Sequence, residues 1–193
     1  MPYGNEDIIT SRVAAQAAKT NTISGTVKIE GVTYTFSERE FPLGFSMVVP
    51  ECFHTLAPEQ ARIKYPYEDR PVVIISSENT TVNLAFDSGG PAVESLGERM
   101  AMYSSLIKHM HPSYVFFGQN IYDLTDGNKV ACFDYRSHAI DSDIYNLNFF
   151  TDFDSQELLG WFNCPIDLRE KWEHLAKQMI KSIKSLPPDE QEE

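Results

Sequence analysis

The sequence predicts an α+β domain, in which a mainly antiparallel β-sheet packs with two long helices. Apolar residues alternate with period two in several short stretches, and in two long stretches their spacing changes to that of an α-helix. Short polar turns separate most of the consecutive strands, and strands joined in this way must be antiparallel. We therefore expect about six to nine strands, with helices at residues 91–110 and 166–185.

The composition limits the classes of partner. The chain has 193 residues, with 16 Lys and Arg against 28 Asp and Glu, so its formal net charge is −12. A protein that binds nucleic-acid phosphates needs a basic surface, and no run of Lys or Arg occurs here, so we expect no nucleic-acid partner. A chain of this length can bury about 70% of its unfolded surface. One core therefore suffices, and a single domain is predicted over residues 23–186.

The two ends of the sequence lack the pattern of its middle. Residues 1–22 are predicted to form a short helix or a tail, and residues 187–193 form an acidic tail that begins with two prolines. No signal-peptide pattern is visible, although a chain trimmed of its leader would look the same. No apolar run is long enough to span a membrane. Three widely spaced cysteines indicate reduced thiols, so we expect a cytoplasmic protein.

The first strands follow from alternating apolar residues on either side of a glycine. Thr26–Glu30 and Val32–Phe36 flank Gly31 and predict a hairpin. A third strand, Phe45–Val49, is expected to end at Pro50, because proline cannot donate to the hydrogen-bond ladder of a sheet.

The next stretch begins irregularly and then becomes strongly apolar. Residues 51–71 form a loop in this interpretation, with a helical turn at Pro58–Lys64. Val72–Ile75 is a continuous apolar run, as expected of a strand that is covered on both faces. A turn leads back into a strand at Val82–Phe86, and the pattern is interrupted at Ser88-Gly89-Gly90.

The spacing of apolar residues then becomes that of a helix. The apolar face over residues 91–110 comprises Val93, Leu96, Met100, Tyr103, Ile107 and Met110. Pro91 suits the first turn of this helix, and Pro112 closes it.

A four-stranded meander and a second helix complete the domain. Five apolar runs follow the first helix, and the four strands of the meander are expected within them: Tyr114–Phe117, Ile121–Leu124, Val130–Tyr135, Ile144–Phe150 and Leu158–Phe162. Asp126-Gly127 is a strong hairpin signal between two of these runs. The apolar face of the last helix comprises Leu168, Trp172, Leu175, Met179 and Ile183.

Several of these segments resemble the PsbP-like fold. They are Phe45–Pro50, Arg70-Pro71 leading into Val72–Ser76, and Phe162-Asn163-Cys164-Pro165 opening the last helix, which has Ser182-Ile183 near its end. The resemblance covers roughly residues 24–185 and implies a PsbP-like α/β sandwich. Residues 1–22 and 51–71 match no counterpart in it.

The resemblance also carries an expectation about function. The PsbP-like superfamily includes extrinsic proteins of the oxygen-evolving complex, a eukaryotic Ran-GTPase-binding protein and bacterial domains of unknown function. Some bacterial members act as chaperones for secreted effectors, and the chain looks most like this bacterial branch. Because these families are mostly non-enzymatic, the resemblance implies a binding role and transfers no catalytic residues.

The residues themselves contain no strong catalytic motif. His109 and His111 are a close pair, but residues two apart on a helix do not share a face. Cys52 and His54 would share one face of a strand, yet a catalytic dyad needs a third group that orients the base. Gly89-Gly90 precedes a helix but lacks the lysine of a phosphate-binding loop. We therefore predict no catalytic residue, no metal site and no cofactor.

Aromatic residues are the most suggestive signal. The chain has 12 Phe, nine Tyr and two Trp. Tyr65 and Tyr67 lie in a proline-bounded loop, and Phe150 and Trp161 place rings on the late strands. Aromatic side chains on a sheet face that no helix covers would form an interaction surface. In the alternative interpretation, the N-terminal segment and residues 51–71 cover that face.

These observations favour a non-catalytic module that binds another protein, such as a chaperone or adaptor. Its acidic charge would favour a basic or an apolar partner segment. Two alternatives stay open: a small-molecule hydrolase with an unrecognised His/Asp or Cys/His site, and a structural subunit of an assembly. We also expect a homodimer, with Ile9, Val13, Phe150 and Trp161 as candidate contacts.

Overall fold

The computed structural model describes residues 21–66, 68–139, 141–153 and 156–187. Its strands are β1 (Val27–Ile29), β2 (Val32–Tyr34), β3 (Phe36–Phe41), β4 (Phe45–Pro50), β5 (His54–Thr55), β6 (Val73–Ser76), β7 (Asn83–Pro91), β8 (Val115–Asp123), β9 (Lys129–His138), β10 (Asp143–Phe153), β11 (Gln156–Pro165) and β12 (Lys184–Ser185). Its helices are α2 (Pro58–Lys64), α3 (Leu96–Met110) and α4 (Arg169–Lys181), the last preceded by a short 3₁₀ turn. The α+β class predicted from the sequence is confirmed.

The main sheet has seven strands in the order β5-β6-β7-β11-β10-β9-β8, and all neighbours are antiparallel. Strands β8 to β11 form the predicted meander. The β6–β7 hairpin joins this meander through β7, which pairs with β11. Two smaller antiparallel sheets accompany it, one of β1 and β2 and the other in the order β12-β4-β3.

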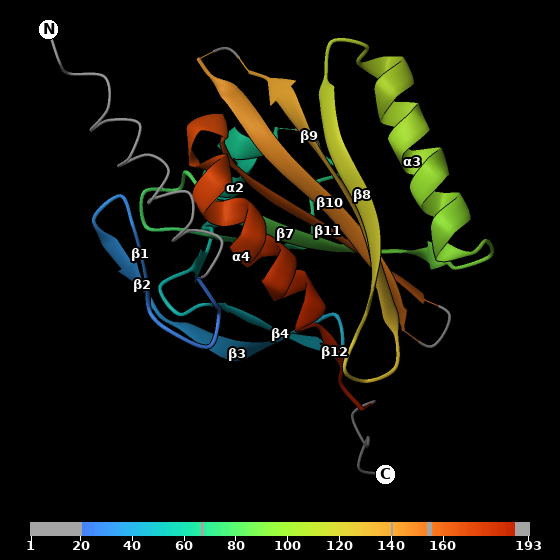
Figure 1. Cartoon of the computed structure of the whole chain (residues 1–193), viewed down its shortest axis with the longest axis horizontal. Helices are drawn as coiled ribbons and strands as arrows, with labels where there is room; N and C mark the ends of the chain where they lie inside the picture. Colours follow the sequence, from blue (N-terminus) through green and yellow to red (C-terminus); the bar gives the residue numbers. More distant parts are fainter. Residues whose placement is uncertain (1–20, 67, 140, 154–155, 188–193) are drawn as a thin grey trace, which may run out of the picture.

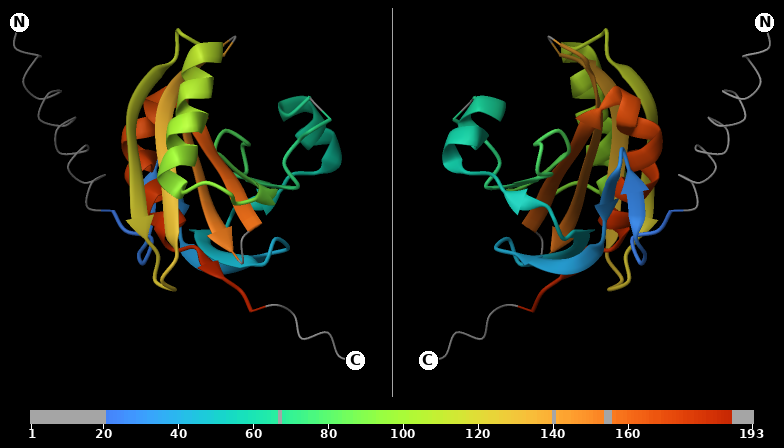
Figure 2. Two further views of the ribbon diagram at one scale, coloured as in Figure 1. Left: turned by 90° about the vertical axis from the view of Figure 1, so that its right-hand side faces the viewer. Right: turned by 90° about the vertical axis from the view of Figure 1, so that its left-hand side faces the viewer.

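The two faces of the main sheet carry different layers. Figure 1 shows α4 and the smaller sheets on one side of it. Figure 2 shows α3 and α2 on the opposite side, separated from each other over the middle of the sheet. The main hydrophobic core lies on the α4 side, and two smaller clusters lie under α3 and α2.

Trp172 of α4 lies at the centre of the main core. Its side chain is fully buried, and its ring centroid lies 4.9 Å from that of Tyr34, 5.9 Å from that of Phe162 and 6.0 Å from that of Phe53. These rings come from a small sheet, a loop, the main sheet and a helix. A single side chain therefore ties four parts of the chain into one core.

Helix α3 begins later than the sequence predicts. Pro91 is the last residue of β7, and the helix starts at Leu96, after Ser95. The Ser95 side chain accepts a hydrogen bond from the Glu98 backbone, and the Glu98 carboxylate accepts one from the Ser95 backbone. This capping box gives the backbone N–H groups of Ser95 and Glu98 a hydrogen-bond acceptor each, so it fixes the start of the helix. The predicted apolar face is correspondingly shorter, because Val93 is 84% exposed.

Replacing Ser95 by alanine should lower the free energy of unfolding by about 1 kcal/mol, because the first turn loses its acceptor. Urea denaturation followed by circular dichroism would measure the change. Ser113, a serine in the turn that follows α3, is a control position at which alanine should have a smaller effect. Equal effects at both positions would contradict the assigned role of the cap.

Two strands are longer than predicted because of glycines. Strand β7 continues through Ser88-Gly89-Gly90, where the Glu157 side chain of β11 lies against Gly89. A β-carbon at Gly89 would lie 2.8 Å from Cβ of Glu157, so glycine lets the two strands approach. Strand β8 is continuous where two runs were predicted, with a register shift next to Gly118. The prediction also missed β12, which follows α4 where helix was expected to reach residue 185.

Candidate functional site

The candidate site lies on the sheet face between α2 and α3. Alternate residues of β10 and β11 form its floor, and we call it the helix-flanked groove. Asn146 and Asn148 come from β10, and Leu159, Trp161 and Asn163 come from β11. The groove contains two adjacent hollows, an apolar one of about 220 Å³ beside α3 and a polar one of about 400 Å³ beside α2.

The apolar hollow lies between the Trp161 side chain and helix α3. Tyr103, Leu106 and Ile107 line it from the helix, and Leu159 and Trp161 line it from β11. Trp161 is half-buried and packs on the cluster beneath α2. The hollow therefore lies where neither helix covers the sheet.

A chain of hydrogen bonds builds the polar hollow. The Lys64 ammonium donates to Oδ1 of Asn83 at 2.8 Å, and Nδ2 of Asn83 donates to Oδ1 of Asn163 at 2.8 Å. The Asn163 carboxamide also hydrogen-bonds the Tyr65 hydroxyl. Ser76 donates to the same oxygen, Oδ1 of Asn83, at 2.7 Å. These hydrogen bonds hold the carboxamides of Asn83 and Asn163 in one orientation.

Burial shifts the ionisation of two groups in the polar hollow. It lowers the pKa of Lys64, because the ammonium loses solvation without gaining a carboxylate partner in the described part of the chain. It raises the pKa of the Tyr65 hydroxyl, and the hydrogen bond with Asn163 acts in the opposite direction. The raised pKa keeps the Tyr65 hydroxyl neutral at neutral pH.

The structure brings together two of the aromatic residues predicted as binding residues. Tyr65 and Trp161 are both half-buried and pack on one apolar cluster at the α2 side of the groove. Phe150 also borders the apolar hollow, but its ring is only 1% exposed because α3 covers it. The expectation of an exposed Phe150 is therefore wrong. Its ring packs edge to face with Tyr103 at 5.3 Å.

The remaining candidates lie outside the described residues. These are Tyr67 and, in the N-terminal segment, Ile9 and Val13. Their roles in binding or dimerisation stay predictions. The irregular stretch 51–71 supplies α2, which covers part of the sheet face as the alternative interpretation expected.

Sequence reasoning missed the polar residues of the groove. Asn83 and Asn163 are 80 positions apart, and their contact depends on the pairing of β7 with β11. No turn joins these strands directly, so no local signal predicts that they are neighbours. Lys64 was placed in a helical turn, but nothing in the sequence shows that its ammonium bends toward the sheet.

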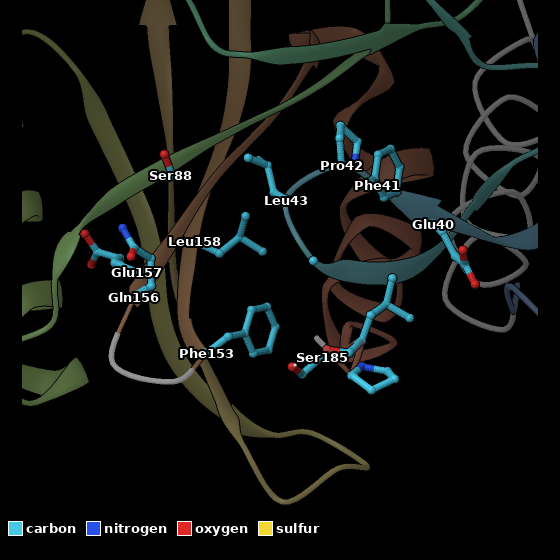
Figure 3. Close-up of a pocket in the computed structure, with 13 residues that line it drawn as sticks. Glu40, Phe41, Pro42, Leu43, Ser88, Phe153, Gln156, Glu157, Leu158 and Ser185 are labelled. Carbon is cyan, nitrogen blue, oxygen red and sulfur yellow. Dashed lines mark hydrogen bonds between the residues drawn. The ribbon is translucent and has the colours of Figure 1, made fainter. Parts of the chain in front are cut away.

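A second cavity, of about 560 Å³, lies at the end of the sheet where β10 and β11 meet the β3–β4 turn. Figure 3 shows Phe153 and Leu158 projecting into it from the sheet, with Leu43 approaching from the turn. Glu157 is the only charged residue of β11 in its wall. Its carboxylate is already engaged by Arg99 and by the Tyr103 hydroxyl, which donates at 2.9 Å. The Glu157 carboxylate is therefore used within the fold, and Glu40 is a second carboxylate in the wall of this cavity.

Two of the three thiols are buried, and their burial shifts their ionisation. Burial raises the pKa of Cys132 to about 12 and also raises that of Cys164, so both remain protonated thiols. Cys52 is exposed, and its pKa is raised, chiefly by partial burial. Within residues 21–187, apart from the undescribed positions 67, 140 and 154–155, no group of three His, Cys, Asp or Glu residues could hold a metal ion.

No described helix is both long and apolar enough to cross a membrane. This finding agrees with the absence of a sufficiently long apolar run in the sequence.

Comparisons with known proteins were made at the level of sequence and of structure. No protein-family model matches the sequence, and no curated protein matches it. The solution structure of the PsbP protein CyanoP from the cyanobacterium Synechocystis is similar, with a TM-score of 0.57 and 11% identity. The match covers 83% of this chain and 98% of CyanoP.

A second similar structure is the Ran-binding protein Mog1p of Saccharomyces cerevisiae, with a TM-score of 0.52 and 9% identity. This match covers 79% of the present chain and 96% of Mog1p. Identities this low establish the fold and nothing finer. Together with the sheet order, they confirm the resemblance inferred from the sequence: the chain has the PsbP-like fold.

Proposed function

We propose that the chain is a protein-binding module of the chaperone or adaptor kind, and that its helix-flanked groove takes a segment of a partner protein. The observation that carries this proposal is the open apolar hollow beside Trp161 and α3. A hollow lined by apolar and aromatic side chains, with polar groups at one end, is the usual form of a binding site.

The exposed side of α3 extends this apolar surface. Met102, Leu106 and Met110 are spaced four residues apart, so they form one stripe along the helix. They are 50%, 53% and 61% exposed, and Leu106 also lines the apolar hollow. Contiguous exposed apolar side chains are characteristic of protein contact surfaces, and methionine adapts readily to different partners.

Two further observations support a protein partner. Mog1p, which shares the fold, is described as a Ran-binding protein. The net charge of −12 would speed the encounter with a basic partner through long-range attraction. The homodimer expected from the sequence remains a further proposal.

A photo-crosslinking amino acid at position 106 tests the proposed function. In lysate of the source cells, benzoylphenylalanine at this position should give a discrete adduct that mass spectrometry identifies. Position 32 on β2 is the matched control, because Val32 is 48% exposed but lies away from the groove. If positions 106 and 32 give the same adducts, or neither gives any, the groove does not bind a partner.

A further inference from the structure

We propose that the groove recognises the carboxyl terminus of its partner, with the terminal carboxylate in the polar hollow at Lys64 and the adjacent apolar side chain in the hollow beside Trp161. This inference rests on the proposed function and specifies which part of a partner protein binds. The charge, the hydrogen-bond donors and the spacing of the two hollows support it.

The ammonium of Lys64 in the wall of the polar hollow favours an anionic ligand. The Lys64 ammonium donates to the backbone carbonyl of Thr80 and to the Asn83 carboxamide, which are both neutral. In the residues that the structure describes, no carboxylate forms an ion pair with it. An ammonium has three donors, so one remains for a ligand. Lys64 is an exposed residue that lines the polar hollow, and its ammonium is complementary to an incoming carboxylate.

Neighbouring side chains supply further hydrogen bonds. Tyr65 hydrogen-bonds with Asn163, and in the described chain no acceptor is assigned to the hydroxyl proton of Tyr65. That proton can therefore be donated to a carboxylate oxygen. Asn146 donates to Ser137 at 2.8 Å and to a backbone carbonyl at 3.2 Å. Its Oδ1 accepts no hydrogen bond from a described residue, so it can accept the N–H of a bound peptide.

The spacing of the hollows fits the end of a peptide. Trp161 and Asn163 are two residues apart on β11, so they lie on the same face about 7 Å apart. A carboxylate and the side chain of the last or the preceding residue can span such a distance. The apolar hollow of about 220 Å³ is smaller than pockets for drug-sized ligands, so it suits one or two apolar side chains.

An internal segment of a partner would form fewer favourable interactions with the groove than a carboxyl terminus would. Its backbone carries no charge, so Lys64 would be partly desolvated without gaining a partner. An internal Asp or Glu side chain could supply the charge, and the experiment is designed to separate this case from a terminal carboxylate.

The test uses short peptides that are attached by their N-termini and randomised at their C-terminal residues. One library ends in free carboxylates and the other in carboxamides. The purified full-length chain should select peptides from the free-carboxylate library that end in a large apolar residue. In fluorescence polarisation, amidation of a selected peptide should weaken binding about tenfold or more. Lys64→Gln should weaken it similarly.

Arg62→Gln is the matched control, because Arg62 lies on the same helix, is exposed and loses the same charge. It should leave peptide affinity within about twofold. If the amidated library selects binders equally well, or selects peptides rich in Asp or Glu, the inference of a terminal carboxylate is wrong while the groove remains a peptide site. If neither library yields binders, this inference also fails, and crosslinking at position 106 decides separately whether the proposed function fails with it.

Discussion

Arg99→Met should lower the free energy of unfolding by about 3–5 kcal/mol, because it leaves the buried carboxylate of Glu157 without its cation. The Arg99 side chain is 4% exposed and forms 2.5 Å ion pairs with Glu157 and Asp152. The Glu157 side chain is 6% exposed, so water cannot replace the lost partner. Urea denaturation followed by circular dichroism would measure the change.

A double variant separates the loss of the ion pair from the loss of packing. Arg99 also lies over the Phe150 ring, at 5.4 Å from its centroid, and methionine preserves part of that contact. In Arg99→Met combined with Glu157→Gln, one buried charge is removed, so a substantial part of the lost stability should return. A single variant that unfolds at nearly the wild-type urea concentration would show that the ion pair contributes little.

Trp172→Ala should lower the free energy of unfolding by about 3–5 kcal/mol, because it opens a cavity at the junction of four elements. Trp172 is fully buried among the rings of Tyr34, Phe53 and Phe162. Thermal and urea unfolding, both followed by circular dichroism, would measure the loss. Fluorescence is less suitable, because the chain has only two tryptophans.

Trp161→Ala is the matched control for this prediction. Trp161 is half-buried at the groove, so its loss should cost less stability than the loss of Trp172. Its effect should instead fall on partner binding. Equal destabilisation by the two substitutions would show that Trp161 serves the core rather than the groove.

Local patterns account for most of the fold. The meander was predictable because Asp126-Gly127 and other short turns join strands that are consecutive in the chain. The spacing of Met100, Tyr103 and Ile107 likewise revealed α3. The start of that helix was misplaced because Pro91 was given more weight than the capping box of Ser95, although both signals are present in the sequence.

The candidate site was predictable only in part, because it depends on contacts between distant segments. Tyr65 and Trp161 were identified from their residue type and surroundings, and the structure places them in one cluster. Their polar neighbours require β7 to pair with β11, and the long connection through α3 leaves that pairing undetermined by sequence. Whether Phe150 is exposed depends on where α3 packs, which periodicity alone does not specify.

The position of β12 has a consequence for the order in which the protein matures during synthesis. β12 pairs with β4, and the Val48 backbone donates to the Ser182 hydroxyl at 2.9 Å, across 134 positions of the chain. On a ribosome, β3 and β4 emerge early, but the strand that completes their sheet emerges only after α4. The edge of β4 must therefore remain without this partner until α4 and β12 have been made, and unpaired edges make nascent chains vulnerable to aggregation. A ribosome-stalled chain that ends before β12 should therefore remain sensitive to protease at β4.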